Sequence, residues 1–172
     1  MWHLVKQHLK ILGVIFSFDL SWDAFVTDLY KRSTQRLFII KRLKNYLSRE
    51  ELLLIYNATV LSLLEYNAPL LIGLNSKNSE KLDKVRRRCH RIICGVDCSC
   101  DRFTPLRTRR EYLALKTFYK IRNSDNLLSN LVPPNLSRSR HSSLLNVPFS
   151  RTLFRQSSFF PYCTLLHNNF CK

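Results

Sequence analysis

Glycine is scarce in this chain, with 3 among its 172 residues. Complete enzymes normally use many glycines in their loops and phosphate cradles, because a residue without a Cβ adopts backbone conformations that other residues avoid. The sequence also has no G-x-x-x-x-G-K-[ST] segment, which excludes a P-loop. The shortage of glycine fits a mostly helical protein with few tight turns.

Groups suited to catalysis are equally sparse. The one adjacent acidic pair, Glu50-Glu51, falls in the first turn of a predicted helix, where capping explains it. Polymerase chemistry needs acidic residues that hold two metal ions. None of the five histidines stands in an H-x-D arrangement, and no serine has a recognisable nucleophile context. We therefore expect no enzymatic activity, no cofactor and no small-molecule substrate.

No secretory signal is apparent at the N-terminus, where the apolar run 11–16 is short and lacks a cleavage site. We expect an intracellular location, cytoplasmic or nuclear, and free thiols at the six cysteines. The segment Leu52–Leu74 carries one charge, Glu65, and has the length of a membrane span. Because Pro69 and several polar residues interrupt it, a buried helix with a proline kink is favoured over membrane anchoring.

A cysteine and histidine cluster invites a zinc interpretation. Its members are Cys89, His90, Cys94, Cys98 and Cys100. The spacing C-x4-C-x3-C-x-C lacks the C-x2-C pairs of most structural zinc sites, and Cys89 falls on an apolar stripe. We expect no bound metal, and a small zinc module remains an alternative.

Positive charge is abundant and unevenly placed. The chain has 28 basic and 12 acidic residues, a net charge of +16, and residues 75–124 alone hold 14 basic and 5 acidic residues. Apolar residues make up 45 % of the sequence, enough for a real core, so the chain is not a disordered basic tail. The excess charge therefore belongs to a folded surface in the middle of the chain.

One predicted helix, from Ser79 to Gly95, carries much of this charge. Its apolar positions recur at helical spacing and are Leu82, Val85, Cys89, Ile92 and Ile93. The remaining positions hold Lys81, Lys84, Arg86, Arg87, Arg88, His90 and Arg91. Glu80 and Asp83 cannot neutralise seven potential cations, which favours a polyanionic partner such as nucleic acid over a merely solvated face.

The other elements follow from periodicity and capping. Residues 9–16 predict a strand or hairpin arm, and Ser21 predicts the N-cap of a helix from Trp22 to about Leu43. Ser48 and Glu51 form a capping box before a helix that Pro69 bends or ends. Thr104-Pro105 opens a helix to about Asn123, and residues after Ser137 show no sustained period. The fold class expected is mostly α, with a region 1–20 containing a short hairpin, a helical domain 21–124 and an irregular tail 125–172.

The order of several short motifs resembles the region downstream of the catalytic palm in non-LTR, LINE-type retrotransposon reverse transcriptases. The motifs are K-I-L-G-V (10–14), D-L-S-W (19–22), R-L-K (42–44), L-L-L-I-Y (52–56), V-L-S-L-L-E-Y (60–66), K-L-D-K-V-R-R-R-C-H-R-I-I-C-G (81–95), P-L-x-x-R-R (105–110), F-Y-K-I-R-N (118–123), V-P-F-S-R-T (147–152) and S-F-F-P (158–161). They cover nearly the whole chain. The same stretch also resembles the N-terminal region catalogued for an AlkB-type DNA-repair homologue.

The resemblance implies a role without catalysis. Lys10, Leu12 and Gly13 would match the primer grip, and the segments from Trp22 to Gly95 would match the thumb, which holds the template–primer duplex through its backbone. The fingers and the palm, with its metal-binding aspartates, have no counterpart here. The residues expected to contact nucleic acid are Lys10, Gly13, Lys81, Lys84, Arg86, Arg87, Arg88, Arg91, Arg109 and Arg110. A decayed element without a selected function is a further alternative.

Overall fold

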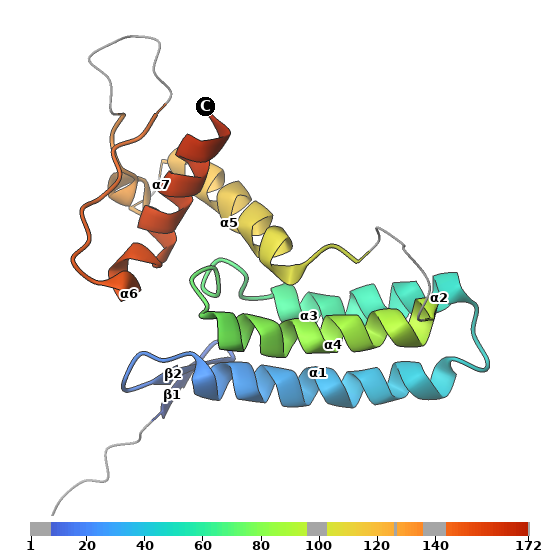
Figure 1. Cartoon of the computed structure of the whole chain (residues 1–172). Helices are drawn as coiled ribbons and strands as arrows, with labels where there is room; N and C mark the ends of the chain where they lie inside the picture. Colours follow the sequence, from blue (N-terminus) through green and yellow to red (C-terminus); the bar gives the residue numbers. More distant parts are fainter. Residues whose placement is uncertain (1–7, 96–102, 126, 136–143, 172) are drawn as a thin grey trace, which may run out of the picture. The chain divides into compact units, whose positions relative to one another are not determined.

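The computed structural model describes residues 8–95, 103–125, 127–135 and 144–171. As expected, it is mostly helical and begins with a short antiparallel hairpin (Figure 1). The chain forms two compact units. Unit 1 comprises Met1–Asn67 and Asn75–Leu106, and unit 2 comprises Ala68–Leu74 and Arg107–Lys172. These units differ from the predicted regions, because the helix after Pro105 groups with the C-terminal residues.

The hairpin joins strand β1, His8–Ile11, to strand β2, Val14–Ser17. The register pairs Ile11 with Val14, which leaves Leu12 and Gly13 as a two-residue turn. Both turn residues have positive φ, 48° at Leu12 and 82° at Gly13. This turn type matches the right-handed twist of the two strands, so a tight hairpin closes here.

Helix α1, Asp23–Leu43, starts one residue later than predicted. The side chain of Asp19 accepts a 3.0 Å hydrogen bond from the backbone N–H of Ser21, and Leu20 has a φ of 56°. These two features hold the chain in a turn through Ser21, so Trp22 is the N-cap and no side chain caps the helix. Asp23 lies in the first turn, where the helix dipole favours a carboxylate.

The face that α1 buries follows the predicted periodicity. Its buried residues are Phe25, Val26, Leu29, Ser33, Leu37 and Ile40. The polar member, Ser33, donates a 2.7 Å hydrogen bond to the carbonyl of Leu29, which satisfies its hydroxyl within the core.

A second helical stretch follows in three parts: α2, Arg49–Ile55, the π-helical η1, Tyr56–Leu61, and α3, Ser62–Glu65. The predicted capping box is present, since the Ser48 hydroxyl accepts from the Glu51 N–H and the Glu51 carboxylate accepts from the Ser48 N–H. The π-helical part was not predicted. The stretch ends at Glu65, four residues before Pro69. Within the described residues, none of the helices combines the length and the apolar character needed to cross a membrane.

Helix α4, Ser76–Cys94, is the predicted basic helix, but it begins three residues before Ser79. The side chain of Asn75 accepts from the N–H of Asn78 at 2.8 Å, so Asn75 is the N-cap and the helix starts ahead of Ser79. Asn78 is itself buried, and its amide donates to the carboxylate of Asp23 at 2.6 Å. Gly95 ends the helix with a φ of 86°, as its position predicted.

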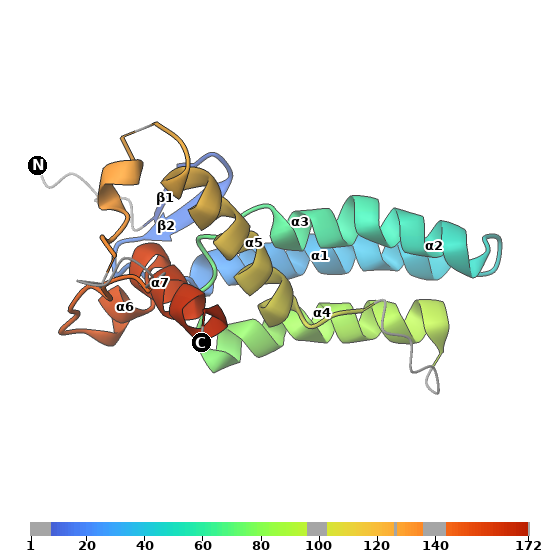
Figure 2. The same cartoon turned by 90° about the horizontal axis from the view of Figure 1, so that it is seen from above.

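The core of unit 1 forms where α4 packs against α1 and α2, and Figures 1 and 2 show these helices side by side. The buried apolar residues of α4 are Leu82, Val85, Cys89 and Ile93. Phe103 closes one side of this core, with its ring centroid 4.9 Å from that of Tyr56 and 4.9 Å from that of His90. Phe25 and Tyr56 are buried, whereas Trp22 is half-buried beside Phe16 and Phe25.

Unit 2 contains helix α5, Leu106–Arg122, from Arg107 onward, the 3-10 helix η2, Ser129–Leu131, and helices α6, Leu153–Gln156, and α7, Phe159–Phe170. Its core consists of Ala114, Phe118, Leu145 and Cys163. The Asn168 side chain bonds both the N–H and the carbonyl of Leu145 at 2.9 Å, which fixes that segment beside α7. The expectation of an irregular tail holds only in part, because α7 is a regular helix whose apolar residues complete this core.

Candidate nucleic-acid interface

Among the basic residues of α4, Arg86 has a structural role because its side chain is bonded within unit 1. Its Nε donates to the carboxylate of Asp83 at 3.0 Å, and its Nη1 donates to the carbonyl of Phe103 at 2.7 Å. The side chain is 16 % exposed. Arg86 therefore stabilises the return of the chain at Phe103 and is left out of the interface proposed below.

Lys81 and Arg88 lie along the contact between α1 and α4. The Lys81 ammonium donates to the Thr27 hydroxyl at 2.9 Å and lies 5.7 Å from the centre of the Tyr30 ring. Arg88 donates from Nη1 to the Tyr30 hydroxyl at 3.1 Å. Hydrogen bonds to neutral hydroxyls and a cation–π contact orient these side chains without neutralising them. Tyr30 thus holds two positive groups at one edge of α4.

Lys84 and Arg87 occupy the outer face of α4. The Glu80 carboxylate is 3.9 Å from the Lys84 ammonium and 3.8 Å from the Arg87 guanidinium. All three side chains are largely exposed, and exposed ion pairs at such distances contribute little. One carboxylate shared by two cations leaves a net positive charge on this face.

A surface hollow of about 480 Å³ lies between α1 and α4. Arg88 and Arg91 contribute from α4, and Lys41 contributes from α1. The other residues that line it are Thr34, Leu37, Phe38 and Ile92. No carboxylate lines this hollow, and the ion pairs found among the described residues do not include its three cations. We call it the α1–α4 hollow.

Sequence reasoning missed Lys41 and Phe38 as members of this surface. Lys41 is one of several cations on α1, and Phe38 lies outside the face that α1 buries. Periodicity gives the face of each helix on which a residue lies, but the partner helix determines which faces meet. The signal that could have found Phe38 is its position one turn from both Thr34 and Lys41.

The remaining predicted contact residues lie elsewhere. Lys10 is exposed on β1 opposite Ile15, and Gly13 is in the hairpin turn. Arg109 and Arg110 belong to α5 in unit 2, and Arg110 is 3 % exposed. A buried guanidinium offers no surface to a nucleic acid, so Arg110 is also left out of the proposed interface.

The cysteine cluster lies only partly within the described residues. Cys89 is fully buried in the core of unit 1, and burial raises the pKa of its thiol to about 12. It packs as a small apolar side chain, as its place on the apolar stripe predicted. Cys98 and Cys100 fall outside the described residues. Across the described part of the chain, no three potential metal ligands come together.

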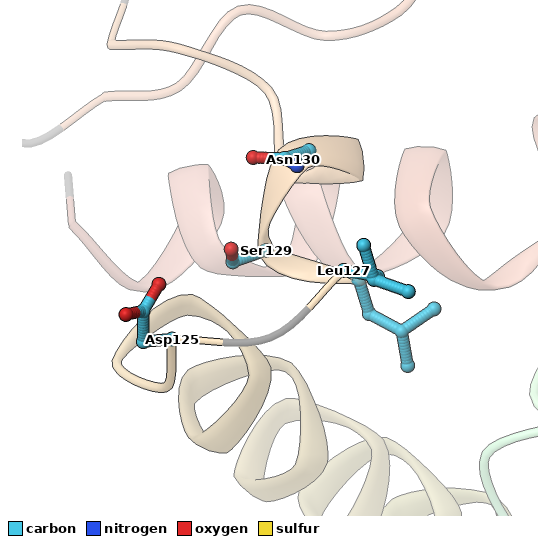
Figure 3. A pocket seen from close by; sticks show the side chains of 5 residues that line it. Asp125, Leu127, Ser129 and Asn130 are labelled. Atoms are coloured by element: carbon cyan, nitrogen blue, oxygen red, sulfur yellow. The ribbon is translucent and has the colours of Figure 1, made fainter.

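Two other hollows are lined by carboxylates instead of cations. One, of about 640 Å³, is lined by residues between α5 and the end of η2, and Figure 3 shows Asp125, Ser129 and Asn130 around it. The second, of about 470 Å³, lies beside the hairpin and is lined by Asp19 and Asp23. The Ser21 backbone N–H and hydroxyl lower the pKa of Asp19 by hydrogen bonding. Both hollows carry carboxylates and no lysine or arginine, so neither suits a polyanion.

Comparisons with protein-family models, with curated proteins and with solved structures found no match for this chain.

Proposed function

We propose that this chain binds the sugar–phosphate backbone of a template–primer duplex. In this proposal it is the non-catalytic C-terminal part of an RNA-directed DNA polymerase of the non-LTR retrotransposon type and acts inside the cell. The observation that supports binding is the set of cations on α4 and the adjoining end of α1. These are Lys41, Lys81, Lys84, Arg87, Arg88 and Arg91, with Glu80 the one carboxylate paired to any of them in the described residues.

Such a surface suits a polyanion with regularly spaced charges. Each cation that neutralises a phosphate releases a condensed counterion, which makes the affinity fall as salt rises. Contacts of this kind read charge and shape rather than base sequence. The order of the motifs supports the more specific assignment to a polymerase thumb, where the backbone of a duplex is the ligand.

A salt titration tests the binding proposal. The double variant K84Q/R87Q is expected to lower the slope of log K against log salt by about 1–2 for a labelled RNA–DNA hybrid, since up to two phosphate contacts are removed. The matched control R151Q/R155Q removes two exposed cations outside the proposed interface and is expected to keep the slope. An unchanged slope in K84Q/R87Q would remove the outer face of α4 from the interface.

The polymerase assignment has its own test. The coding sequence upstream of Met1 is expected to contain an open frame that encodes an aromatic-x-Asp-Asp motif, because a palm needs metal-binding aspartates. If the upstream sequence lacks such a motif while the chain itself binds nucleic acid, the polymerase assignment is wrong and the nucleic-acid proposal stands.

A further inference from the structure

The α1–α4 hollow combines positive charge with an exposed aromatic ring. Lys41, Arg88 and Arg91 line it together with Phe38, whose surface is 57 % exposed. Its volume of about 480 Å³ lies within the range of small-ligand sites, roughly 300–1,000 Å³. The hollow is therefore large enough for one organic anion rather than for a bare ion alone.

The positive charges that line the hollow favour an anionic ligand. Arg88 is oriented by the Tyr30 hydroxyl at 3.1 Å, and the hollow has no carboxylate in its lining. Phosphate is an anion that guanidinium groups bind by paired hydrogen bonds. Two arginines one helical turn apart on α4, at positions 88 and 91, can both reach one phosphodiester.

The exposed Phe38 ring favours a single-stranded ligand over a duplex. Aromatic side chains beside cations bind single strands, because unpaired bases stack on the ring while the cations follow the backbone. In a duplex, the faces of the bases are already covered by their neighbours. Thr34 adds a hydroxyl to the lining, and Leu37 and Ile92 supply apolar surface against which a base or sugar can pack.

We propose that the α1–α4 hollow binds one unpaired nucleotide of a single-stranded segment, with its base on Phe38 and its phosphate at Arg88 and Arg91. This inference rests on the proposed nucleic-acid function and narrows its ligand to a nucleic acid with an unpaired stretch. The outer face of α4, with Lys84 and Arg87, remains available to the backbone of an adjoining duplex.

Equilibrium binding of the full chain to labelled oligo(dT) and to a blunt duplex of equal length tests this inference. Phe38→Ala is expected to weaken oligo(dT) binding by roughly 5- to 150-fold, the effect of losing one stacked base, and to leave duplex binding within about twofold. Phe38→Trp is expected to keep or increase the affinity for oligo(dT). The control Ile39→Ala removes a neighbouring apolar side chain that is 56 % exposed and is expected to change neither affinity.

The outcomes separate this inference from the proposed function. If Phe38→Ala leaves oligo(dT) binding unchanged, or weakens both ligands equally, the nucleotide site is wrong. The proposed function still stands in that case if K84Q/R87Q lowers the salt slope for the hybrid. If the unaltered chain binds neither oligo(dT) nor a duplex, both proposals fail. Since Phe38 is mostly exposed, its truncation leaves the core of unit 1 intact, and far-ultraviolet circular dichroism checks this.

Discussion

At the residue scale, Leu12 occupies a backbone conformation that its side chain does not favour. Its φ is 48°, in the left-handed region, and the residue is 84 % exposed, so no packing of the side chain offsets the strain. For a residue with a Cβ this conformation costs about 1–2 kcal/mol. The hairpin register forces it, because Ile11 pairs with Val14 and leaves two residues for the turn.

Leu12→Asn is expected to increase the free energy of unfolding by about 1 kcal/mol, because asparagine adopts this conformation readily and is favoured in two-residue turns. Urea denaturation followed by circular dichroism measures the change. Leu127→Asn is the control, since Leu127 is 88 % exposed and lies outside the hairpin. A gain of equal size in both variants would show that reduced surface hydrophobicity, rather than the turn, is responsible.

At the element scale, the π-helical part η1 depends on a contact from α1. A π-helix widens the turn and weakens the regular hydrogen-bond ladder. The Arg36 guanidinium donates from Nη1 to the backbone carbonyl of Thr59, and the Thr59 hydroxyl donates to the carbonyl of Ile55 at 2.6 Å. Arg36 therefore serves the packing of α1 against η1 instead of the positive surface.

Arg36→Met is expected to destabilise the protein by about 1.5–3 kcal/mol, because it keeps the aliphatic stem and removes a charged donor from a partly buried carbonyl. The midpoint of urea denaturation measures this effect. Arg42→Met, at an exposed site on the same helix, is expected to change stability by less than about 0.5 kcal/mol. Equal stability of the two variants would contradict the role assigned to Arg36.

At the scale of the whole molecule, the chain crosses between the two units three times. It enters unit 2 at Ala68, returns to unit 1 at Asn75 and continues in unit 2 from Arg107. Residues Ala68–Leu74 belong to unit 2, although the helices on both sides of them belong to unit 1. Ile72 packs against the core of unit 2, and Gly73 lies against Ser157. A Cβ on Gly73 would fall 2.2 Å from the Ser157 carbonyl oxygen. Glycine is required here because of this close approach.

Gly73→Ala is expected to loosen unit 2 by about 1–3 kcal/mol, since the backbone at Ser157 must move to admit the methyl group. Hydrogen exchange measured by mass spectrometry is expected to show faster exchange in α5 and α7, with α1 unchanged. Leu70→Ala shortens a side chain in the same segment at a site that is 45 % exposed and serves as the control. Uniform acceleration across both units would contradict the separate packing of unit 2.

Much of unit 1 could be predicted from local patterns. The hairpin, the Ser48–Glu51 capping box, the end of α4 at Gly95 and the buried stripe from Leu82 to Ile93 are each encoded within a few residues. Helix starts were less certain, because Asp19 and Asn75 act on the backbone two or three residues away and shift the first turn. The C-terminal helix α7 escaped prediction, since its buried residues include polar Thr164 and His167.

The sequence by itself determined that the chain is mostly helical, strongly basic and centred on one amphipathic helix, because net charge and periodicity are properties of composition and order. Only the tertiary structure decided which cations remain available. Arg86 is engaged by Asp83 and Phe103, whereas Arg88 donates to the Tyr30 hydroxyl and lines the α1–α4 hollow together with Lys41 and Phe38. The physical reason is that the role of a charge depends on its neighbours in space, and for α4 those neighbours come from α1 and from the chain at Phe103.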